Sequence, residues 1–501
     1  MPTVTAPKNP VAPRRGRPAT ELIFGDLWEY DPAPETADPK LKPRYELFIN
    51  GEFVPARSGK YFDSINPANE QKLTELALGG AADVDAAFAA ATRAFAGWSR
   101  LPGRERGKFL FRIARLLQDR AREFAVAETM DNGKPIRETR DFDVPTAAAH
   151  FFYHGGWADK LEYVAPGRRL APLGVVGQVI PWNFPLLMLS WKIAPALAAG
   201  NCVVIKPATN TPVTAVKLAE IFQDAGLPPG VVNVLTGPGA TGGLIMAHPS
   251  AAKIAFTGST EVGKVIMRSV AGTDRRMTME LGGKAANIVF ADAPLDQAVE
   301  GIVNGIFFNQ GQVCCAGSRL LVEETVADVV VAKLKQRLRV LRVGDPLDKN
   351  TDVGAIVSRA QLDTIRRYLD IGQKEGATMW QPPCRLPARG FFLPPTIFTG
   401  VTQSHCIARE EIFGPVLSIL TFRTLEEAVE KANNTAYGLS AGVWTDKGSR
   451  ILKMSTELKA GVVWANTFNK FDPTSPFGGY KESGFGREGG RHGLLDYAKL
   501  V

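Results

Sequence analysis

The chain has 501 residues, of which 45% are hydrophobic and 22% are charged, and its formal net charge is +8. This length accommodates two or three domains, and the composition is that of a globular protein rather than of a disordered or fibrous one. No uninterrupted apolar run reaches the roughly 18–20 residues that a membrane helix needs, so we do not expect a membrane partner.

The first 42 residues are expected to form a proline-rich extension, with seven prolines among the first 34 positions. Arg14, Arg15 and Arg17 are its basic cluster. We interpret this cluster as part of a solvated tail rather than as a nucleic-acid-binding arm, because the other basic residues are spread along the chain. The tail lacks the apolar stretch of a secretory signal and the amphipathic pattern of a transit peptide, so the sequence predicts a cytoplasmic protein.

Folded structure is expected to begin near Tyr45, where residues 46–54 have strand composition around an Asn50-Gly51 turn. Two segments that follow, 81–98 and 104–129, have apolar residues at helical spacing. From residue 174 short β-branched runs alternate with helices, which indicates right-handed βαβ units and a parallel sheet. The expected strands are 175–180, 202–206, 231–237, 253–258 and 287–290, with helices at 187–199, 214–225 and 263–270.

A second α/β series begins after about residue 283. Two such series, with a cysteine pair early in the second, suggest a cofactor domain and a catalytic domain that meet at a cleft. The expected elements are strands at 319–324, 416–422, 442–445 and 461–467, and helices at 327–339 and 359–373.

Two glycine-containing loops are candidates for binding a phosphate group. Residues 237–242 match GxGxxG directly after a strand, although the chain has 49 glycines and a chance match is easy. Residues 256–263 follow the next strand and place Gly258-Ser259 before a helix, whose free N–H groups and positive dipole end favour a pyrophosphate. Either loop can also be read as an ordinary strand-to-helix turn.

Cys314 and Cys315 stand between Gly311 and Gly317, which favours a tight backbone with open access to sulfur. A thiolate is a strong nucleophile, and the hemithioacetal that it forms with an aldehyde can release hydride. The alternative is a buried structural pair. The five cysteines have neither the number nor the spacing of a disulfide framework or a metal site, so no metal is expected.

Two further side chains fit the same chemistry. Glu280 stands among apolar residues before a Gly-Gly turn, and partial burial would raise its pKa toward the range of a general base; the alternative is a turn carboxylate paired with Lys284. Asn183 lies in the rigid loop 181–185, and its amide could stabilise an oxyanion by about 3 kcal/mol; the alternative is a proline-locked core turn.

In their order and wording these segments resemble the aldehyde dehydrogenase superfamily, from about Tyr45 to the C-terminus. The matching motifs are PWNFP (181–185), FTGS (256–259), ELGGK (280–284), GQVCCAGSR (311–319), EEIFGP (410–415) and PFGGYKESGFGRE (476–488). The resemblance implies an α/β fold with a Rossmann-like nucleotide-binding domain, a second α/β catalytic domain and a small oligomerisation hairpin. In this chain these would be residues 43–153 and 174–282, residues 283–480, and a shortened hairpin at 154–173, with a C-terminal segment at 481–501.

The resemblance implies oxidation of an aldehyde to a carboxylic acid with reduction of NAD or NADP, through a thioester on Cys314. Glu280 would activate the hydrolytic water, and Asn183 would stabilise the oxyanion together with the backbone N–H of Cys314. Lys192 and Glu488 resemble positions proposed to pass protons away from the base.

The resemblance also implies a cofactor site and a substrate tunnel. It makes residues 237–242 a structural turn near the cofactor and favours residues 258–263 as the pyrophosphate loop, and Cys315 becomes a neighbour without a chemical role. The tunnel aromatics suggest an apolar or aromatic aldehyde, with Arg168, Arg169 and Lys470 as uncommitted candidates for binding a charged one. The implied cofactor contacts are Ile180, Pro181, Trp182, Lys206, Thr209, Gly239, Phe256, Gly258, Ser259, Leu281, Glu411 and Phe413, and the implied tunnel residues are Phe184, Trp191, Phe471 and Phe477.

Two departures from the family pattern matter. Thr209 stands three residues after Lys206, where many NAD-selective members have a glutamate that would repel a 2′-phosphate, so we expect NAD use with tolerance of NADP. The segment after Trp157 looks short for the usual hairpin, and the chain stops at Val501, where tetrameric members continue into a C-terminal strand. We therefore expect a homodimer.

Three other functions are compatible with parts of the sequence. A silent family member acting as a scaffold is disfavoured, because Cys314, Glu280 and Asn183 are all present. A dehydrogenase that transfers the acyl group to coenzyme A is disfavoured by the intact Glu280 motif. A cofactor-independent thiol hydrolase would need a histidine partner, and none lies near Cys314 in the sequence.

Overall fold

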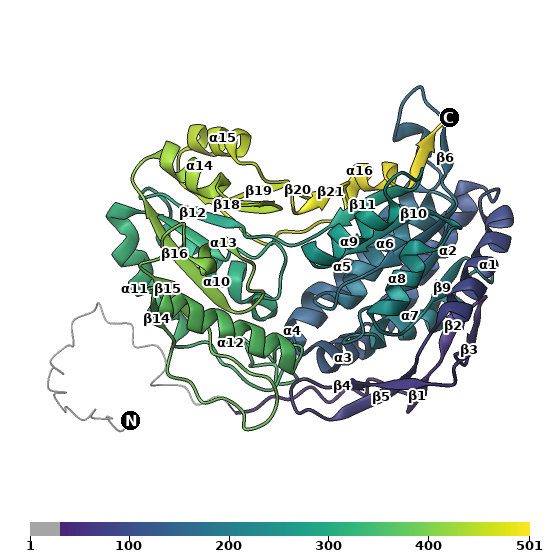
Figure 1. Ribbon diagram of the computed structural model, residues 1–501, viewed down its shortest axis with the longest axis horizontal. Helices are drawn as coiled ribbons and strands as arrows, with labels where there is room; N and C mark the ends of the chain where they lie inside the picture. Colours follow the sequence, from purple (N-terminus) through teal and green to yellow (C-terminus); the bar gives the residue numbers. More distant parts are fainter. Residues whose placement is uncertain (1–30) are drawn as a thin grey trace, which may run out of the picture. The chain divides into compact units, whose positions relative to one another are not determined.

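The computed structural model describes residues 31–501, and residues 32–501 form one compact unit built around two large sheets (Figure 1). Most of the expected proline-rich extension, including its arginine cluster, lies outside the described residues. In the part of the chain that is described, no helix combines the length and apolarity needed to cross a membrane.

The first large sheet has a parallel centre and antiparallel edges. Its strand order is β21-β11-β10-β7-β8-β9-β2-β3, and the pairs from β11 to β9 are all parallel. Every residue of β8 is buried, as expected for a strand covered on both faces. The strands span Gly484–Phe485 (β21), Arg276–Glu280 (β11), Ala251–Thr257 (β10), Val175–Val179 (β7), Cys202–Lys206 (β8), Val232–Val234 (β9), Leu47–Ile49 (β2) and Glu52–Val54 (β3).

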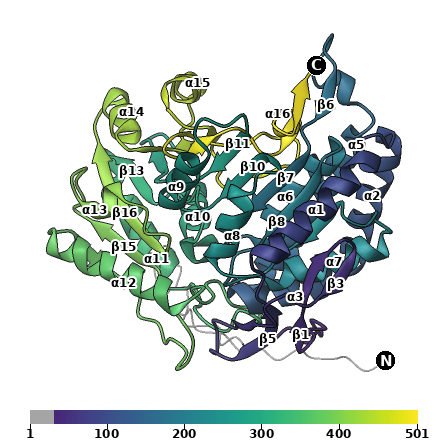
Figure 2. The ribbon, with the colours of Figure 1, turned by 45° about the vertical axis from the view of Figure 1, so that its right-hand side comes forward.

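Helices cover both faces of this sheet (Figure 2). Helices α1 and α8 each contact β7 and β8 on one side. On the other side α6 contacts β8 and α7 contacts β9. Helix α2 then packs on α6 and α7, and α5 packs on α6. The helices are α1 (Ala81–Trp98), α2 (Gly103–Asp119), α3 (Ala121–Asn132), α5 (Val144–Trp157), α6 (Pro185–Ala198), α7 (Val213–Asp224), α8 (Gly239–Ala247) and α9 (Thr260–Val270).

The second large sheet has the order β14-β15-β16-β13-β12-β18-β19, and only the β14–β15 pair is antiparallel. Its strands span Thr378–Trp380 (β14), Thr396–Thr399 (β15), Val416–Phe422 (β16), Arg319–Glu323 (β13), Ala286–Val289 (β12), Ser440–Trp444 (β18) and Val462–Ala465 (β19). The helices around it are α10 (Leu295–Phe307), α11 (Ala327–Leu338), α12 (Arg359–Lys374), α13 (Cys406–Arg409), α14 (Leu425–Asn433) and α15 (Gly448–Glu457).

The two predicted α/β series correspond to the two large sheets, while individual strands differ from the prediction. The strand predicted at 287–290 is β12, which belongs to the second sheet rather than to the first. Strand β11, which ends at Glu280, was not predicted, because its sequence RMTME has neither a β-branched run nor a clean alternation.

The C-terminal region joins two sheets instead of ending alone. Strand β21 pairs with β11, and β22 (Ala498–Leu500) pairs antiparallel with β6 (Leu170–Pro172). The chain thus ends in a short strand that pairs within the chain, and the expectation about pairing across subunits stays a prediction. The segment 154–173 provides one strand of this small sheet and residues 498–500 provide the other, while residues 154–157 still belong to α5.

The remaining elements are β1 (Arg44–Tyr45), β5 (Lys72–Ala77) and β4 (Tyr61–Ile65) in one sheet, β17 (Tyr437–Gly438) with β20 (Tyr480–Lys481), and helices α4 (Ile136–Glu138) and α16 (Gly490–Leu495).

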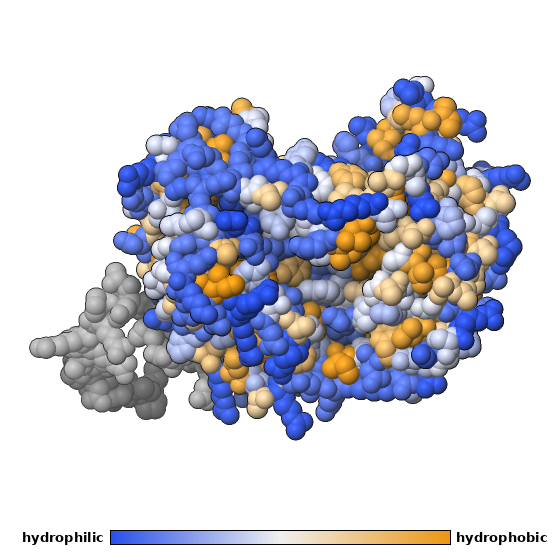
Figure 3. All heavy atoms as spheres, viewed as in Figure 1, coloured by the Kyte–Doolittle hydropathy of each residue, from blue (hydrophilic) through white to orange (hydrophobic). Residues whose placement is uncertain are grey.

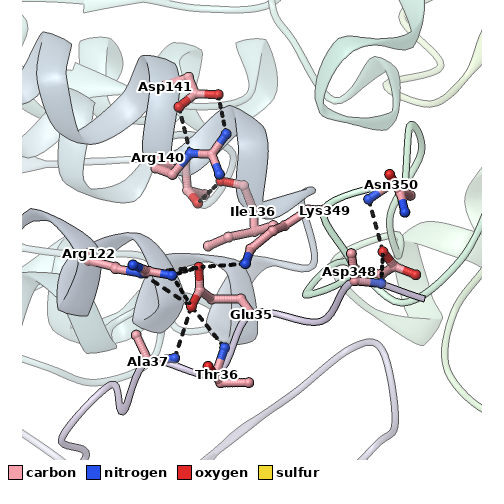
Figure 4. A network of polar contacts seen from close by, with 12 residues as sticks. Glu35, Thr36, Ala37, Arg122, Ile136, Arg140, Asp141, Asp348, Lys349 and Asn350 are labelled. Atoms are coloured by element: carbon pink, nitrogen blue, oxygen red, sulfur yellow. Dashed lines mark hydrogen bonds and ion pairs between the residues drawn. The ribbon is translucent and has the colours of Figure 1, made fainter. Parts of the chain in front are cut away.

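A short segment before the first strand contacts both α/β halves, the one around the first sheet and the one around the second. Glu35 accepts hydrogen bonds from Arg122 on α3 and from the backbone N–H groups of Thr36 and Ala37 (Figure 4). Its own N–H donates to the carbonyl of Leu347, and Lys349 lies 3.9 Å from its carboxylate. Because Leu347 and Lys349 precede α12 of the second sheet, this segment bridges both α/β halves.

Candidate active site

The predicted cofactor residues lie at one edge of the first sheet. Parallel strands all end at the same edge, and this is where α/β proteins bind nucleotides. Ile180–Trp182 follow β7, Lys206 ends β8, Gly239 begins α8 after β9, Gly258 and Ser259 follow β10, and Leu281 follows β11. The structure therefore brings together residues that are 100 positions apart in the sequence.

The loop after β10 provides hydrogen-bond donors for an anion. Ser259 caps α9, its hydroxyl accepting from the N–H of Val262, and the first turn of this eleven-residue helix leaves further N–H groups without helical acceptors. Lys206 is 3% exposed, and burial lowers its pKa to about 8. Its ammonium donates to the carbonyl of Pro207. A buried lysine beside free N–H groups fits the ribose and pyrophosphate of a dinucleotide.

The other glycine loop is occupied by contacts within the protein. Thr209 donates to the carbonyl of Gly237, and Thr241 donates to that of Gly79. A side chain at Gly242 would contact Lys206, so the loop lies beside the nucleotide edge. These contacts favour a structural turn near the cofactor, as the resemblance implied.

Cys314 follows a strained turn that an amide network holds in place. Asn309 and Gln310 have φ angles of 46° and 54°, a left-handed conformation that costs of order 1–3 kcal/mol for a residue with a side chain. Asn183 donates through Nδ2 to the carbonyl of Gln312 at 2.9 Å, and Nδ2 of Asn309 donates to the carbonyl of Asn183 at 2.8 Å. The PWNFP loop and the cysteine loop are therefore bound to each other.

The turn is also held by the loop that precedes α12. Gln310 donates to the carbonyl of Ala355, and the side-chain oxygen of Gln312 accepts from the N–H of Val357. The sequence analysis did not single out Asn309, Gln310 or Gln312, although three amide side chains within four residues before the cysteine were a visible signal.

Cys314 is partly exposed and packs against the same apolar cluster as Phe184 and Trp191. Hydrogen bonding to Cys315, together with burial, raises the pKa of Cys314 well above the usual value of a thiol. In this arrangement the thiol form of Cys314 is favoured over the thiolate.

Glu280 ends β11 and is 5% exposed. Among the described residues, neither of its carboxylate oxygens has a hydrogen-bond partner. Burial, and then the negative charge of Glu488, raise its pKa well above the usual value, while Lys192 lowers it. The alternative pairing with Lys284 is not found, because the ammonium of Lys284 has no hydrogen-bond partner in the described part of the chain.

Glu280 lies close both to the loop before α9 and to Cys314. Its carbonyl accepts from the N–H of Gly258 in the loop before α9, and the charge of Cys314 also raises its pKa. A Cβ atom at Gly478 would lie 2.8 Å from Oε1 of Glu280, so only glycine leaves room for the carboxylate there.

Glu411 and Phe413 reach the site from the loop between α13 and β16. Glu411 accepts from the N–H of Gly283 at 2.9 Å, and burial raises its pKa to about 7. Phe413 has a φ of 58°, and its ring lies edge-on to Trp182 at 5.1 Å. Both residues therefore cross from the second α/β half to the nucleotide edge of the first.

The four predicted tunnel residues belong to one aromatic cluster. Trp191, Phe471 and Phe477 contact one another with ring centroids 5.5–6.4 Å apart. Phe184 is connected to them through Phe142, a residue that the sequence analysis did not single out. Lys470 and Asn469 neighbour the cluster in sequence, whereas Arg168 and Arg169 lie beside the β6–β22 sheet.

No group of three or more histidine, cysteine or acidic side chains within residues 31–501 is arranged to hold a metal ion. A parallel sheet with hydrogen-bond donors at its strand ends, a cysteine on a rigid loop and an unpartnered buried carboxylate fit an α/β enzyme that binds a nucleotide. Comparison with known proteins makes this more specific.

Residues 53–501 match the family model described as the aldehyde dehydrogenase family. The chain is 47% identical over 462 residues to an aldehyde dehydrogenase of Alternaria alternata, covering 90% of this chain and 93% of that protein. It is 43% identical to retinal dehydrogenase 2 of Homo sapiens, covering 92% of each. A mutant of P. syringae AldA indole-3-acetaldehyde dehydrogenase, solved with NAD+ and IAA, superposes with a TM-score of 0.89 at 42% identity, covering 92% and 96%.

The chain belongs to the aldehyde dehydrogenase family. The predicted fold class is confirmed, and the protein is an oxidoreductase that converts an aldehyde to an acid.

Proposed function

We propose that this enzyme works through a covalent thioester on Cys314. A water molecule that Glu280 activates then hydrolyses this thioester. The observation that carries the proposal is the buried carboxylate of Glu280, whose pKa responds to the charge of Cys314 and whose oxygens have no partner among the described residues. A carboxylate in such surroundings is a stronger base than usual, and its free oxygens can accept a proton from water.

In the first half of the reaction the thiol of Cys314 releases its proton to solvent, and its sulfur bonds to the aldehyde carbon. The carbonyl oxygen becomes an oxyanion. Asn183 uses one amide hydrogen to bind the carbonyl of Gln312, and its second hydrogen is available to the oxyanion together with the backbone N–H of Cys314. When the oxyanion collapses, the C–H bond breaks, hydride leaves and a thioester remains.

In the second half Glu280 takes a proton from water, whose oxygen attacks the thioester. The C–S bond breaks, the acid leaves and the thiol is restored. Lys192 and Glu488 form a buried ion pair near the base, with Tyr497 3.5 Å from Glu488. We propose that this pair sets the pKa of Glu280 and receives its proton.

NAD+ is the cofactor that the strand edge favours, with NADP+ tolerated. When bound, it accepts the hydride. Support comes from the donors of the α9 turn and from Lys206, and from the P. syringae enzyme, which was solved with NAD+. Thr209 places a neutral hydroxyl beside Gly237 and offers no charge to oppose a 2′-phosphate.

The aromatic cluster next to Cys314 favours an apolar or aromatic aldehyde, because its walls offer ring faces and few charges. We also propose a homodimer. The β6–β22 sheet carries exposed apolar side chains, with Leu500 47% and Val501 62% exposed, and hydrophobic surface gathers where this sheet projects (Figure 3). Light scattering that showed a stable tetramer would reject the dimer. The cytoplasmic location stays a prediction.

The covalent step can be tested with the Glu280→Gln variant, which should form the thioester and fail to hydrolyse it. Mixing this variant with benzaldehyde and NAD+ should give a burst of NADH close to one equivalent, followed by little turnover. Intact mass and peptide mapping should place a benzoyl group on Cys314. Absence of the burst and of the adduct would reject the mechanism, and a strict requirement of the wild type for coenzyme A would favour the acylating alternative.

A further inference from the structure

Glu138 is a buried carboxyl group that the proposed reaction does not use. It ends the short helix α4, directly before the π-helical turn Thr139–Asp143, and it is 7% exposed. The segment is fixed on both sides, because Lys134 and Asp143 form a fully buried ion pair at 2.7 Å. The carboxyl of Glu138 therefore has little freedom to move.

This carboxyl contacts the strained turn before the catalytic cysteine. Oε2 of Glu138 accepts a hydrogen bond from the backbone N–H of Asn309 at 2.9 Å. Asn309 is the first of three consecutive residues with left-handed φ angles, 46°, 54° and 71°, and the third is Gly311. A left-handed conformation at Asn309 and Gln310 persists only where surrounding contacts fix it.

The turn is connected directly to the oxyanion site. The side chain of Asn309 donates to the carbonyl of Asn183 and, at 3.3 Å, to the carbonyl of Gln312. That carbonyl is also the acceptor of Nδ2 of Asn183. Glu138 holds the backbone of Asn309, and Asn309 holds both the backbone and the amide acceptor of Asn183.

We infer that Glu138 is a positioning residue for aldehyde oxidation: by accepting from the N–H of Asn309, it fixes the turn that aims the amide of Asn183 at the oxyanion. The inference rests on the proposed function. What the role requires is an oxygen acceptor at this position and not a negative charge. Burial, which raises the pKa of Glu138 to about 8, is consistent with this, because a protonated carboxyl still has a carbonyl oxygen that accepts.

The test compares two substitutions of similar volume. Glu138→Gln keeps an acceptor oxygen, whereas Glu138→Met removes it and leaves the N–H of Asn309 buried without a partner. We expect kcat for benzaldehyde oxidation to fall about ten- to a hundredfold in the Met variant, with KM changed by less than about twofold, since small misplacements of an oxyanion donor have effects of this size. The Gln variant should keep kcat within about threefold of the wild type.

A double-mutant cycle then asks whether Glu138 acts through Asn183. If it does, adding Glu138→Met to Asn183→Ala should cause no further loss of kcat, because the donor that it positions is already gone. Asp141→Asn is the matched control: Asp141 lines the same cavity of about 390 Å³ as Glu138, but it pairs with Arg140 and is expected to change kcat by less than about twofold.

Equal losses in the Gln and Met variants, or additive losses in the cycle, would overturn the inference. So would a Met variant that does not fold, because the acceptor would then serve the fold rather than the oxyanion. Failure of the proposed function looks different: Glu280→Gln would give neither the NADH burst nor the benzoyl adduct on Cys314, and Asn183→Ala would be as active as the wild type.

Discussion

The ammonium of Lys192 lies 2.6 Å from the carboxylate of Glu488, and these side chains are 1% and 4% exposed. They come from α6 and from the C-terminal segment, 296 residues apart. Both charges act on Glu280, and they act in opposite directions: Glu488 raises its pKa and Lys192 lowers it. A buried ion pair beside the base thus tunes the pH at which the base is ionised.

This relationship predicts opposite shifts of the pH profile. Glu280 is a base only as the carboxylate, so thioester hydrolysis should rise with pH through its pKa. Glu488→Gln removes a negative charge, lowers that pKa and should move the rising limb to lower pH. Lys192→Met removes a positive charge and should move it to higher pH. The limb is measured as kcat against pH under conditions where hydrolysis limits the rate.

Glu482→Gln serves as the control for this pair of variants, because Glu482 is exposed, pairs with Lys264 and is not among the charges that shift the pKa of Glu280. Its profile should match that of the wild type. Shifts of the same sign in Glu488→Gln and Lys192→Met would contradict the tuning role.

The two adjacent cysteines should respond very differently to substitution. Cys314→Ala removes the atom that bonds to the substrate, and kcat should fall by about 10⁴-fold or more. Cys315→Ala, which removes a buried thiol that donates to Asn469, should stay within about fivefold. Steady-state formation of NADH and titration of thiols provide the two readouts. An inactive Cys315→Ala variant together with an active Cys314→Ala variant would make Cys315 the nucleophile instead.

Cofactor preference should depend on residue 209. Thr209→Glu places a carboxylate next to the bound ribose, where it can accept from a diol and repels a 2′-phosphate. We expect kcat/KM with NADP+ to drop about tenfold or more while that with NAD+ changes little, since a like-charge contact costs at least 1.4 kcal/mol. Thr209→Gln is the neutral control of the same length. Equal losses with both cofactors in the Glu variant would place residue 209 away from the ribose.

Gly478→Ala should damage hydrolysis without touching the cysteine. The added methyl group would lie 2.8 Å from Oε1 of Glu280 and 2.6 Å from the carbonyl of Gly486, so the carboxylate has to move. A displacement of this size should lower kcat about tenfold or more. The NADH burst, which reports the earlier steps, should persist. Gly448→Ala, which meets nothing within 4 Å, is the control and should leave kcat unchanged.

Glu35→Ala should weaken the connection between the two α/β halves. The variant loses four hydrogen bonds to Arg122 and two to backbone N–H groups (Figure 4), and the free energy of unfolding in urea should fall by about 2 kcal/mol. Asp38→Ala, an exposed carboxylate that caps only the N–H of Lys40, should have little effect.

The same carboxylate predicts a pH dependence of stability. Burial would raise the pKa of Glu35, but Arg122 and the backbone N–H groups outweigh it and lower the pKa to about 2. Because the folded pKa lies below the unfolded one, the stabilisation is present above about pH 4.5 and is lost as the pH falls toward 2. The difference between wild type and Glu35→Ala should therefore shrink in acid.

Much of this protein followed from local sequence. Helix α1 has the predicted bounds, and β8 and β16 lie at the predicted β-branched runs. These elements could be predicted because the spacing of apolar residues along the chain reflects which face of an element is buried. The motif around Cys314 also indicated a reactive thiol, and its role as the nucleophile stays a prediction.

Tertiary structure alone decided what surrounds those residues. Lys192 meets Glu488, and Glu138 meets Asn309, across 296 and 171 positions. No spacing rule connects such pairs, because the contacts exist only after two sheets and the C-terminal segment have packed together. The same holds for β11, which is a strand because β10 and β21 pair with it and not because RMTME favours one. The sequence specifies the reactive groups, and their protonation and aim depend on burial and neighbours that only the folded chain provides.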